Sequence, residues 1–291
     1  MLKRTITRLL DYTKALPLYL LPQHGLTAIV YKLTRSEKKA WKNFLIKIFI
    51  KLFKVDMEQA IRPSEKDYSC FNDFFTRQLK SDARSWEKDK NNILSPVDGA
   101  VSQIGKINKD RLIQAKGFDY SLKRLLANDE NAVERFQDGS FTTLYLSPKD
   151  YHRIHMPISG KLIKTIFVPG DLFSVNNASV RTINNLFARN ERFISLFETE
   201  LGLMAQIMVG AMFVGSMETV FAGQITPTKH RQINVKEYAE ESINLEQAEE
   251  FGHFNMGSTV ILLFEKDKIS WSEELKEESA IQVGQIIGTR L

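Results

Sequence analysis

The chain contains little cysteine and no long uninterrupted apolar run. Its single cysteine, Cys70, excludes an intramolecular disulfide and a zinc site built from several cysteines. No stretch approaches the roughly 18 consecutive apolar residues that a membrane-spanning helix requires. The apolar segment 15–31 is interrupted by Pro17, Pro22 and Gly25, and it lacks the continuous apolar core and the cleavage site of a signal peptide. We therefore expect neither a membrane-spanning helix nor a signal peptide.

Sequence signatures of several common enzyme classes are also missing. The chain has no Gly-x-x-x-x-Gly-Lys-Ser/Thr loop for phosphates and no Gly-x-Gly-x-x-Gly turn after a strand. It has no Gly-x-Ser-x-Gly motif, which presents the nucleophile in many hydrolases. The sequence therefore disfavours a nucleotide-binding protein and an ordinary hydrolase.

Basic residues are concentrated near the N-terminus. Residues 1–54 contain twelve Lys or Arg and only two acidic residues, whereas the net charge of the whole chain is only +5. The rest of the chain is therefore mildly acidic. Such an asymmetry indicates an anionic partner for the N-terminal segment, either a membrane or a nucleic acid.

The apolar residues of segment 41–54 distinguish between these two partners. Lysines at positions 42, 47, 51 and 54 are interspersed with apolar residues at helical intervals, namely Phe44, Leu45, Ile48, Phe49 and Leu52. A basic amphipathic helix of this kind is typical of proteins that bind at the level of lipid headgroups. We therefore expect residues 1–60 to form a helical extension on an anionic membrane surface, with no nucleic acid. The alternative is a helix packed on its own domain with solvated lysines.

Short β-branched runs separated by Gly, Pro, Asn and Asp begin near residue 93 and continue to the end of the chain. They predict strands at 99–107, 141–146, 161–168, 204–214, 219–225, 258–264 and 281–289. Helices are expected at 70–80, 121–128 and 239–250. The expected fold class is therefore α+β, with a strand-rich, barrel-like domain over residues 61–291 behind the helical extension 1–60.

The five histidines of the chain supply few candidates for acid–base chemistry. His152 and His155 lie three residues apart, after a predicted strand and a Ser-Pro-Lys-Asp turn. On a helical turn they would share a face and could ligate a metal, but no third ligand has suitable spacing and Pro157 limits a helix. We expect no metal site and interpret the pair as an active-site base and a hydrogen-bond donor. A structural role for one of them stays open.

Two further features have little meaning on their own. Asp98 follows Pro96 and precedes Gly99, which is first of all the composition of a turn. Gly257 and Ser258 open an apolar strand, which is also common. Chemically, however, glycine offers an unhindered carbonyl, and the serine presents a hydroxyl one residue further on. A serine that attacks the preceding peptide carbonyl needs this arrangement.

Short segments that share a known pattern occur in order along most of the chain, at residues 74–79, 95–101, 113–117, 120–122, 151–157, 173–176, 189–192, 209–211 and 257–259. Together they resemble the phosphatidylserine decarboxylase family. The family's usual Leu before Gly-Ser-Thr is Met256 here. Because methionine is also flexible and apolar, the resemblance still implies processing at the following step.

The resemblance implies a triad formed by Asp98, His155 and Ser258, in a proenzyme that cuts itself. His155 would take the proton of Ser258, and Asp98 would orient the imidazole. The serine hydroxyl would then attack the Gly257 carbonyl, and elimination and hydrolysis would convert Ser258 into a covalent pyruvoyl cofactor. The products would be a beta chain, residues 1–257, and an alpha chain, residues 258–291.

The implied reaction of the processed enzyme converts phosphatidylserine to phosphatidylethanolamine and CO₂. The pyruvoyl ketone would form a Schiff base with the substrate amine and act as an electron sink. His152 is the implied proton donor or substrate-positioning group, although His155 could share that task. The diacyl substrate implies that the active site reaches a lipid headgroup in an anionic membrane. Since the sequence has no transit peptide and no spanning segment, we expect a peripheral protein on the cytoplasmic side of the cell membrane. A homodimer is a candidate assembly.

The residues alone leave two alternatives to a self-cleaving decarboxylase. A serine hydrolase could use Asp98, His155 and Ser258 without self-cleavage. A lipoyl-like carrier or a membrane-bound binding module would be non-enzymatic, and segments 157–160 and 283–288 are similar to barrel-type carrier folds. A carrier would need a lysine at an exposed hairpin tip, and no lysine stands out there.

Overall fold

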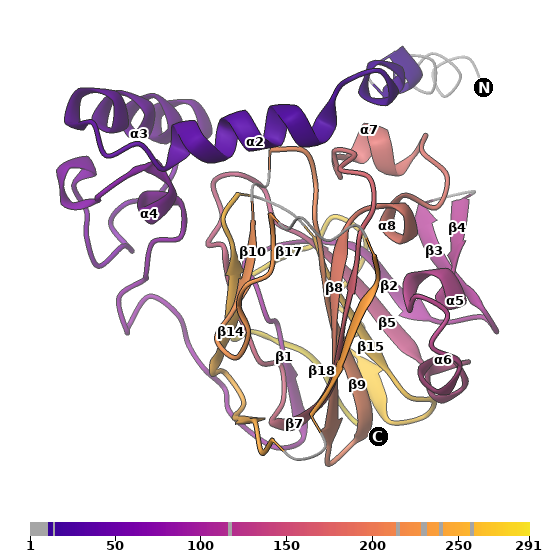
Figure 1. Cartoon of the computed structure of the whole chain (residues 1–291). Coiled ribbons are helices and arrows are strands. Elements are labelled where there is room, and N and C mark those ends of the chain that lie inside the picture. The colour runs from indigo at the N-terminus through magenta and orange to yellow at the C-terminus, as the bar shows by residue number, and fades with distance from the viewer. Residues whose placement is uncertain are drawn as a thin grey trace.

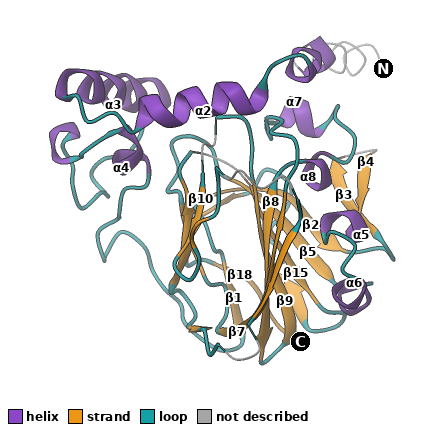
Figure 2. Ribbon diagram, viewed as in Figure 1, coloured by secondary structure: helices purple, strands orange, loops and turns teal. Residues whose placement is uncertain are grey.

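The computed structural model describes residues 11–13, 15–115, 118–213, 216–227, 232–238, 241–256 and 259–291. In Figure 1, the N-terminal helices lie in a row across the top of a strand-rich body. Figure 2 shows the same division, with strands filling the body and short helices at its right-hand side. The α+β class and the helical N-terminal extension are confirmed.

The N-terminal helical layer consists of η1 (Leu16–Tyr19), α2 (Gln23–Thr34) and α3 (Lys39–Phe53). Two prolines mark where helices begin: Pro17 lies in the first turn of η1, and Pro22 is the residue before α2. A proline costs no backbone hydrogen bond at such a position, because the first N–H groups of a helix have no partner within it. Helix α3 ends at Phe53, and the following residue, Lys54, caps it in a left-handed conformation.

Helix α3 packs one of its faces on the short helix α4 (Phe71–Phe75), which follows η2 (Glu65–Asp67). Its Ile46 is fully buried in a cluster that includes Phe71, Phe74 and Phe75 of α4. Leu45 and Phe49 pack against the same cluster. The apolar residues of this helix therefore divide into two sets, because Phe44, Ile48 and Leu52 are 56%, 46% and 69% exposed.

The main sheet has nine antiparallel strands in the order β12-β7-β8-β9-β15-β5-β2-β17, with β13 also pairing with β7. In chain order these are β2 (Gly99–Lys106), β5 (Ser140–Tyr145), β7 (Gly160–Val168), β8 (Arg192–Thr199), β9 (Gly202–Val209), β12 (Asn234–Glu237), β13 (Asn244–Leu245), β15 (Thr259–Phe264) and β17 (Ala280–Ile281). The path is open, and within the described ranges no pairing closes it. The barrel-like arrangement expected from the sequence is therefore not confirmed.

Three smaller sheets complete the body. One has the order β11-β10-β14-β6, and a second has the order β1-β18-β16, while β3 and β4 form a hairpin. The strands are β1 (Asn92–Leu94), β3 (Arg111–Ala115), β4 (Phe118–Ser121), β6 (Arg153–His155), β10 (Met217–Thr219), β11 (Gly223–Gln224), β14 (Glu250–Phe254), β16 (Ile269–Trp271) and β18 (Ile286–Arg290). The short helices are α5 (Leu122–Leu125), α6 (Glu130–Phe136), α7 (Asn177–Val180) and α8 (Leu186–Arg189).

Three sequence-based predictions of elements are wrong. The helix expected at 239–250 contains no helix in its described part, residues 241–250, where the chain forms β13 and enters β14. The segment 219–225, expected to be one strand, instead contains the end of β10, a turn and the strand β11, which pair as a hairpin. The strand expected at 281–289 is divided into β17 and β18, because Gly284 between them turns the chain with a φ of +87°.

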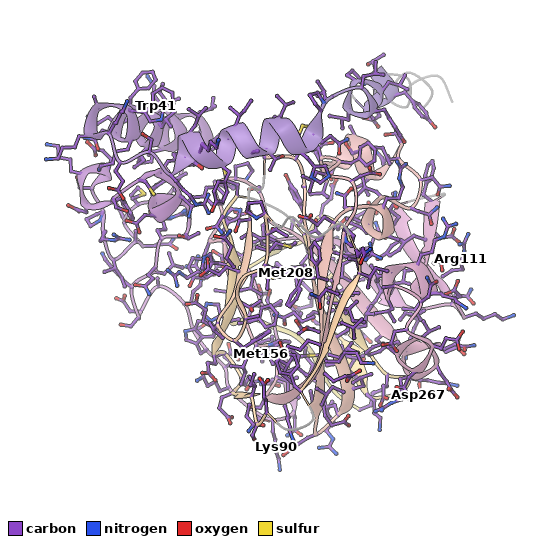
Figure 3. The ribbon with its side chains drawn as sticks, viewed as in Figure 1. Trp41, Lys90, Arg111, Met156, Met208 and Asp267 are labelled. Carbon is purple, nitrogen blue, oxygen red and sulfur yellow. The ribbon has the colours of Figure 1, made fainter. Side chains whose placement is uncertain are left out.

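The interior of the body is apolar and continuous. Figure 3 shows Met156 and Met208 inside the body, while the side chains of Lys90, Arg111 and Asp267 project from its periphery. All six residues of β15 are buried, because this strand lies between β9 and β5 in the middle of the main sheet. The residue that follows the predicted cleavage step, Thr259, is the first residue of this strand.

Candidate active site

One row of residues across the main sheet shows how the site is assembled. Thr259 pairs with Val209 on one side and with Tyr145 on the other, and Tyr145 also pairs with Ala100. Asp98 lies two residues before Ala100, so it is near the end of the sheet at which β15 begins. Gly257 and Ser258 lie outside the described residues, and their neighbours Met256 and Thr259 bracket the step between them.

Asp98 is buried and held by two partners. The guanidinium of Arg84 donates two hydrogen bonds to it, from Nε to Oδ1 at 3.0 Å and from Nη2 to Oδ2. The backbone N–H of Val283 donates to Oδ1 at 2.8 Å. The side chains of this ion pair are 8% and 10% exposed. Such a two-pronged arginine–carboxylate pair fixes the orientation of the carboxylate as well as its position.

The contacts of His155 define its tautomer. Nδ1 lies 2.9 Å from the carbonyl oxygen of Ala248 and must therefore carry the proton, since a carbonyl only accepts. Nε2 is then unprotonated, and it accepts a hydrogen bond from the hydroxyl of Tyr151 at 3.1 Å. Burial lowers the pKa of His155, and the hydrogen bond to Ala248 opposes this effect. His155 is therefore a neutral imidazole with a lone pair on Nε2, the form that a general base needs.

His152 is fully buried, and one of its two ring nitrogens has no hydrogen-bond partner in the described structure. Its Nδ1 donates to the carbonyl oxygen of Asp150 at 2.8 Å. Its Nε2 has no hydrogen-bond partner among the residues that the structure describes. Burial, followed by the positive charge of Arg77, lowers the pKa of His152 to about 3. The imidazole is therefore neutral near pH 7, and its Nε2 can accept a hydrogen bond in this state but has no proton to donate.

The structure brings Asp98 and His155 to adjacent segments without joining their side chains. The backbone N–H of His155 donates to the carbonyl oxygen of Pro96 at 2.8 Å, two residues before Asp98. The polar contacts of the two side chains nevertheless run to different partners, Arg84 for Asp98 and Ala248 and Tyr151 for His155. Orientation of the imidazole by Asp98 stays a prediction.

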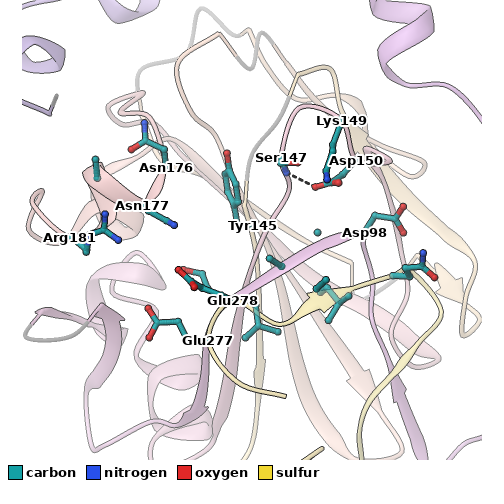
Figure 4. Close-up of a pocket in the computed structure, with 18 of the residues that line it drawn as sticks. Asp98, Tyr145, Ser147, Lys149, Asp150, Asn176, Asn177, Arg181, Glu277 and Glu278 are labelled. Carbon is teal, nitrogen blue, oxygen red and sulfur yellow. Dashed lines mark hydrogen bonds between the residues drawn. The ribbon is translucent and has the colours of Figure 1, made fainter. Parts of the chain in front are cut away.

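Two cavities meet at this end of the sheet. Figure 4 shows the larger one, of about 850 Å³, with Asp98 and Asp150 on one side and Arg181 on the other. The smaller cavity, of about 260 Å³, is lined mainly by apolar residues, including Phe49 of α3 and Met256. Tyr145 and Asn176 line both cavities. A larger cavity that contains charged side chains and a smaller, mainly apolar cavity therefore lie next to the predicted cleavage step.

Comparison with known proteins shows the family of the chain. A family model described as phosphatidylserine decarboxylase matches residues 71–289, and a model described as PSD matches residues 13–54. The chain belongs to the phosphatidylserine decarboxylase family. The second match covers α2 and α3, so the N-terminal helical layer is recognised together with the body.

Curated relatives match nearly the whole chain. A phosphatidylserine decarboxylase proenzyme of Nitrosococcus oceani is 47% identical over 97% of this chain and 92% of its own length. One of Psychromonas ingrahamii is 45% identical over 97% of this chain and 99% of its own. One of Shewanella sp. (strain ANA-3) is 47% identical over 95% of this chain and 96% of its own. Each of these relatives bears the name of a proenzyme.

Several residues of the site could not be predicted from the sequence. Arg77 and Tyr151 lie in segments that carried the family resemblance, but no role was assigned to them. Arg84 lies in a polar stretch without a recognisable pattern, so no signal in the sequence marked it. Outside this site, Glu191 also had no predicted role, and burial raises its pKa to about 7. It lines a cavity of about 70 Å³ that α2 helps to form.

Proposed function

We propose that the chain is a proenzyme that cuts itself between Gly257 and Ser258 and then decarboxylates phosphatidylserine by means of the resulting pyruvoyl group. The observation that supports this proposal is the family match over the body. In addition, relatives that match this chain over nearly their whole length are named as proenzymes. The alternatives without self-cleavage, a serine hydrolase or a carrier, do not account for the proenzyme names.

For the self-cleavage step, His155 is the base that the geometry supports. Its Nδ1–H is held by the carbonyl oxygen of Ala248, which leaves the Nε2 lone pair for an incoming hydroxyl proton. The hydroxyl of Tyr151 now occupies this lone pair, so it must move or relay the proton when Ser258 reacts. Asp98, close by and paired with Arg84, completes the proposed triad.

The residues around the step suit a pyruvoyl group at position 258. The neighbouring residue Thr259 is anchored in the middle of the main sheet, and the orphan Nε2 of His152 is a buried acceptor without a partner in the described structure. When bound, the group supplies an electron sink for the loss of CO₂. His152 would position the substrate through Nε2. Protonation of the product by His152 would require that Nε2 first gain a proton.

The two cavities suit the two ends of a lipid molecule. The larger cavity offers Lys149 and Arg181 as cations and several carboxylates, which can recognise the charged headgroup. The smaller cavity lies between α3 and the body and offers an apolar lining. We assign the headgroup to the first and the beginning of an acyl chain to the second, with the reacting centre where they meet near Tyr145.

The helical layer is proposed to rest on an anionic membrane. On α3, Phe44, Ile48 and Leu52 form an exposed apolar stripe, and Lys47 and Lys51 lie on the same helix. This combination makes α3 a basic amphipathic helix of the interfacial type. No helix in the described ranges is long and apolar enough to cross a bilayer. We assign the protein to the cytoplasmic face as a peripheral protein, with a homodimer as its candidate assembly.

Intact-mass measurement of the purified protein tests the proposal. The expected result is two fragments, one of which begins at residue 258 and reacts with hydrazine-type carbonyl reagents. Ser258→Ala should give one unbroken chain without decarboxylase activity. A purified wild-type chain that is active while uncut would overturn the pyruvoyl assignment. Hydrolytic activity of that uncut chain would favour the serine hydrolase.

A further inference from the structure

A single segment between α4 and β1 contacts both members of the proposed acid–base pair. We call residues 81–90 the strap. From it, Arg84 forms the ion pair with Asp98. Two residues further on, the ring of Trp86 lies 4.9 Å from the ring of His155, measured between centroids. The strap therefore contacts two groups from separate segments, Asp98 in the bend before β2 and His155 at the end of β6.

The guanidinium of Arg84 is itself held on more than one side. Besides its two bonds to Asp98, its Nη1 donates to Oε1 of Gln59 at 2.5 Å and to the carbonyl oxygen of Ala83 at 2.6 Å. Gln59 is in turn held by Asp56, through a hydrogen bond of 2.6 Å from Nε2 to Oδ2. A planar group with partners along several edges has one orientation, which a lysine ammonium cannot reproduce.

The body is shaped to receive the strap at Gly284. This residue has a φ of +87°, and a Cβ placed on it would lie 2.4 Å from the carbonyl oxygen of Ser85 and 3.0 Å from the ring of Trp86. The residue before it, Val283, donates its N–H to Asp98. The same turn therefore admits the strap and holds the carboxylate, so the position of Asp98 is fixed from both sides.

We propose that Arg84 is a positioning residue for self-cleavage, and that it acts by holding the Asp98 carboxylate in place beside His155. This inference rests on the proposed function. Removal of Arg84 would leave a buried carboxylate whose only remaining hydrogen bond in the described structure comes from the N–H of Val283. Such a carboxylate is expected to rotate or to draw in water, and small displacements of catalytic groups slow reactions strongly.

The test measures the rate at which newly made precursor, produced by cell-free synthesis, releases the 258–291 fragment. Arg84→Ala is expected to slow cleavage roughly a hundredfold, in line with the effect of a misplaced catalytic group. Guanidinium chloride at a concentration that does not denature the protein should restore part of the rate, whereas sodium chloride at the same ionic strength should not. Arg84→Lys should be slow too and should not respond to guanidinium.

Arg62→Ala is the matched control. Arg62 also makes a two-pronged pair, with Asp73 at 2.6 and 3.0 Å, but neither residue touches Asp98 or His155. This variant should cleave at close to the wild-type rate and show no response to guanidinium. If Arg84→Ala behaves like Arg62→Ala, or if it is slow without any guanidinium rescue, Arg84 has only a structural role and the inference is wrong.

A milder variant covers the case in which Arg84→Ala does not fold. Gln59→Ala leaves the ion pair intact and removes only one support of the guanidinium, so cleavage should slow several-fold while the melting temperature stays near that of the wild type. An unchanged rate would contradict the inference. Wild-type and Ser258→Ala precursors are measured in the same series. A wild-type chain that never cleaves would refute the proposed function itself. If the wild-type chain cleaves normally, a difference in the Arg84 variants reports on Arg84 alone.

Discussion

The ring of Phe75 lies 4.1 Å from the imidazole of His152, measured between centroids. Phe75 also contacts Phe49 of α3, with 5.8 Å between ring centroids. A continuous series of ring contacts therefore connects the inner face of the proposed membrane-binding helix with a histidine of the candidate site. Because these rings exclude water from His152, they are a physical cause of its low pKa.

His152 is expected to stay neutral across the physiological range. Its folded-state pKa of about 3 lies below the ordinary value of 6.5, so between these values the unfolded chain binds a proton that the folded protein does not. Stability is therefore lost as the pH falls from 6.5 towards 3. NMR of ¹⁵N-labelled histidine should show the Nδ1–H form of His152 without titration between about pH 5 and 8.

Phe75→Ala provides the comparison for His152. Loss of the ring admits water, so the pKa of His152 should rise towards its ordinary value and the NMR signals should begin to titrate within the measured range. A wild-type His152 that titrates near pH 6.5 would contradict the neutral assignment.

Glu191 should make stability decrease as the pH rises from acidic to neutral values. Burial raises its pKa from 4.5 to about 7, so across this window the folded protein binds a proton that the unfolded chain has released. Stability therefore falls as the pH rises from 4.5 to 7. Glu191→Gln keeps the shape without the charge and should stabilise the protein by about 1–3 kcal/mol at pH 8. Near pH 4.5 the effect should be small.

Urea denaturation at the two pH values measures this difference. Ser258→Ala serves as the background, so that a single uncut chain unfolds in each experiment. An equal effect of Glu191→Gln at both pH values would indicate a packing change and would refute the titration.

The exposed stripe of α3 should be required for membrane binding. Exchange of Phe44, Ile48 and Leu52 for serine removes apolar surface without emptying the core, because all three side chains are exposed. Sedimentation with anionic vesicles should show a roughly tenfold or greater loss of affinity, given the transfer free energy of such side chains. The melting temperature should change little.

Ile113→Ser is the matched control for the stripe. Ile113 is 51% exposed and belongs to the β3–β4 hairpin, outside the helical layer. Vesicle binding should be unaffected by this exchange. Equal losses from both variants would show that general surface hydrophobicity, and not α3, drives sedimentation.

Gly284→Ala should lower the stability of the protein far more than the same exchange at Gly223, another glycine with a positive φ. An alanine at position 284 would be strained by the positive φ, and its Cβ would lie only 2.4 Å from a backbone oxygen. We expect a loss of about 2–4 kcal/mol in the free energy of unfolding. Gly223→Ala is the control, since Gly223 has a φ of +66° and nothing lies within 4 Å of its added Cβ.

The Gly223→Ala control should lose only about 1 kcal/mol, from backbone strain alone. Urea denaturation of both variants in the Ser258→Ala background provides the comparison. Similar losses of unfolding free energy at the two positions would show that the strap does not pack closely against residue 284.

Local patterns predicted much of the fold, and tertiary pairing decided the rest. The apolar run of β15 could be recognised because burial on both faces leaves a continuous apolar segment. The segment 239–250 has a helix-like composition, yet Glu250 pairs with His155 across β14 and β6. Strand β8 was not predicted at all, although it lies between β7 and β9 in the main sheet.

The candidate site was predictable only where its residues carry a motif. Asp98, His152 and His155 could be named from the sequence because short segments around them resemble a known family. Their partners could not be named, because Arg84 and Ala248 reach the site through loops whose paths depend on the whole fold. The neutral state of His152 also depends on packing by Phe75, which comes from a different helix.

The central position of β15 has a consequence for the lifetime of the protein. The proposed cut would leave residues 258–291 as a separate molecule whose first strand is inserted between β9 and β5. Removing it would split the main sheet, so the two chains should stay together without a covalent bond. Once fully denatured, however, they would have to meet again by diffusion, and the short chain would have to enter a preformed gap. Maturation would thus turn a chain that folds on its own into a complex that does not readily reassemble.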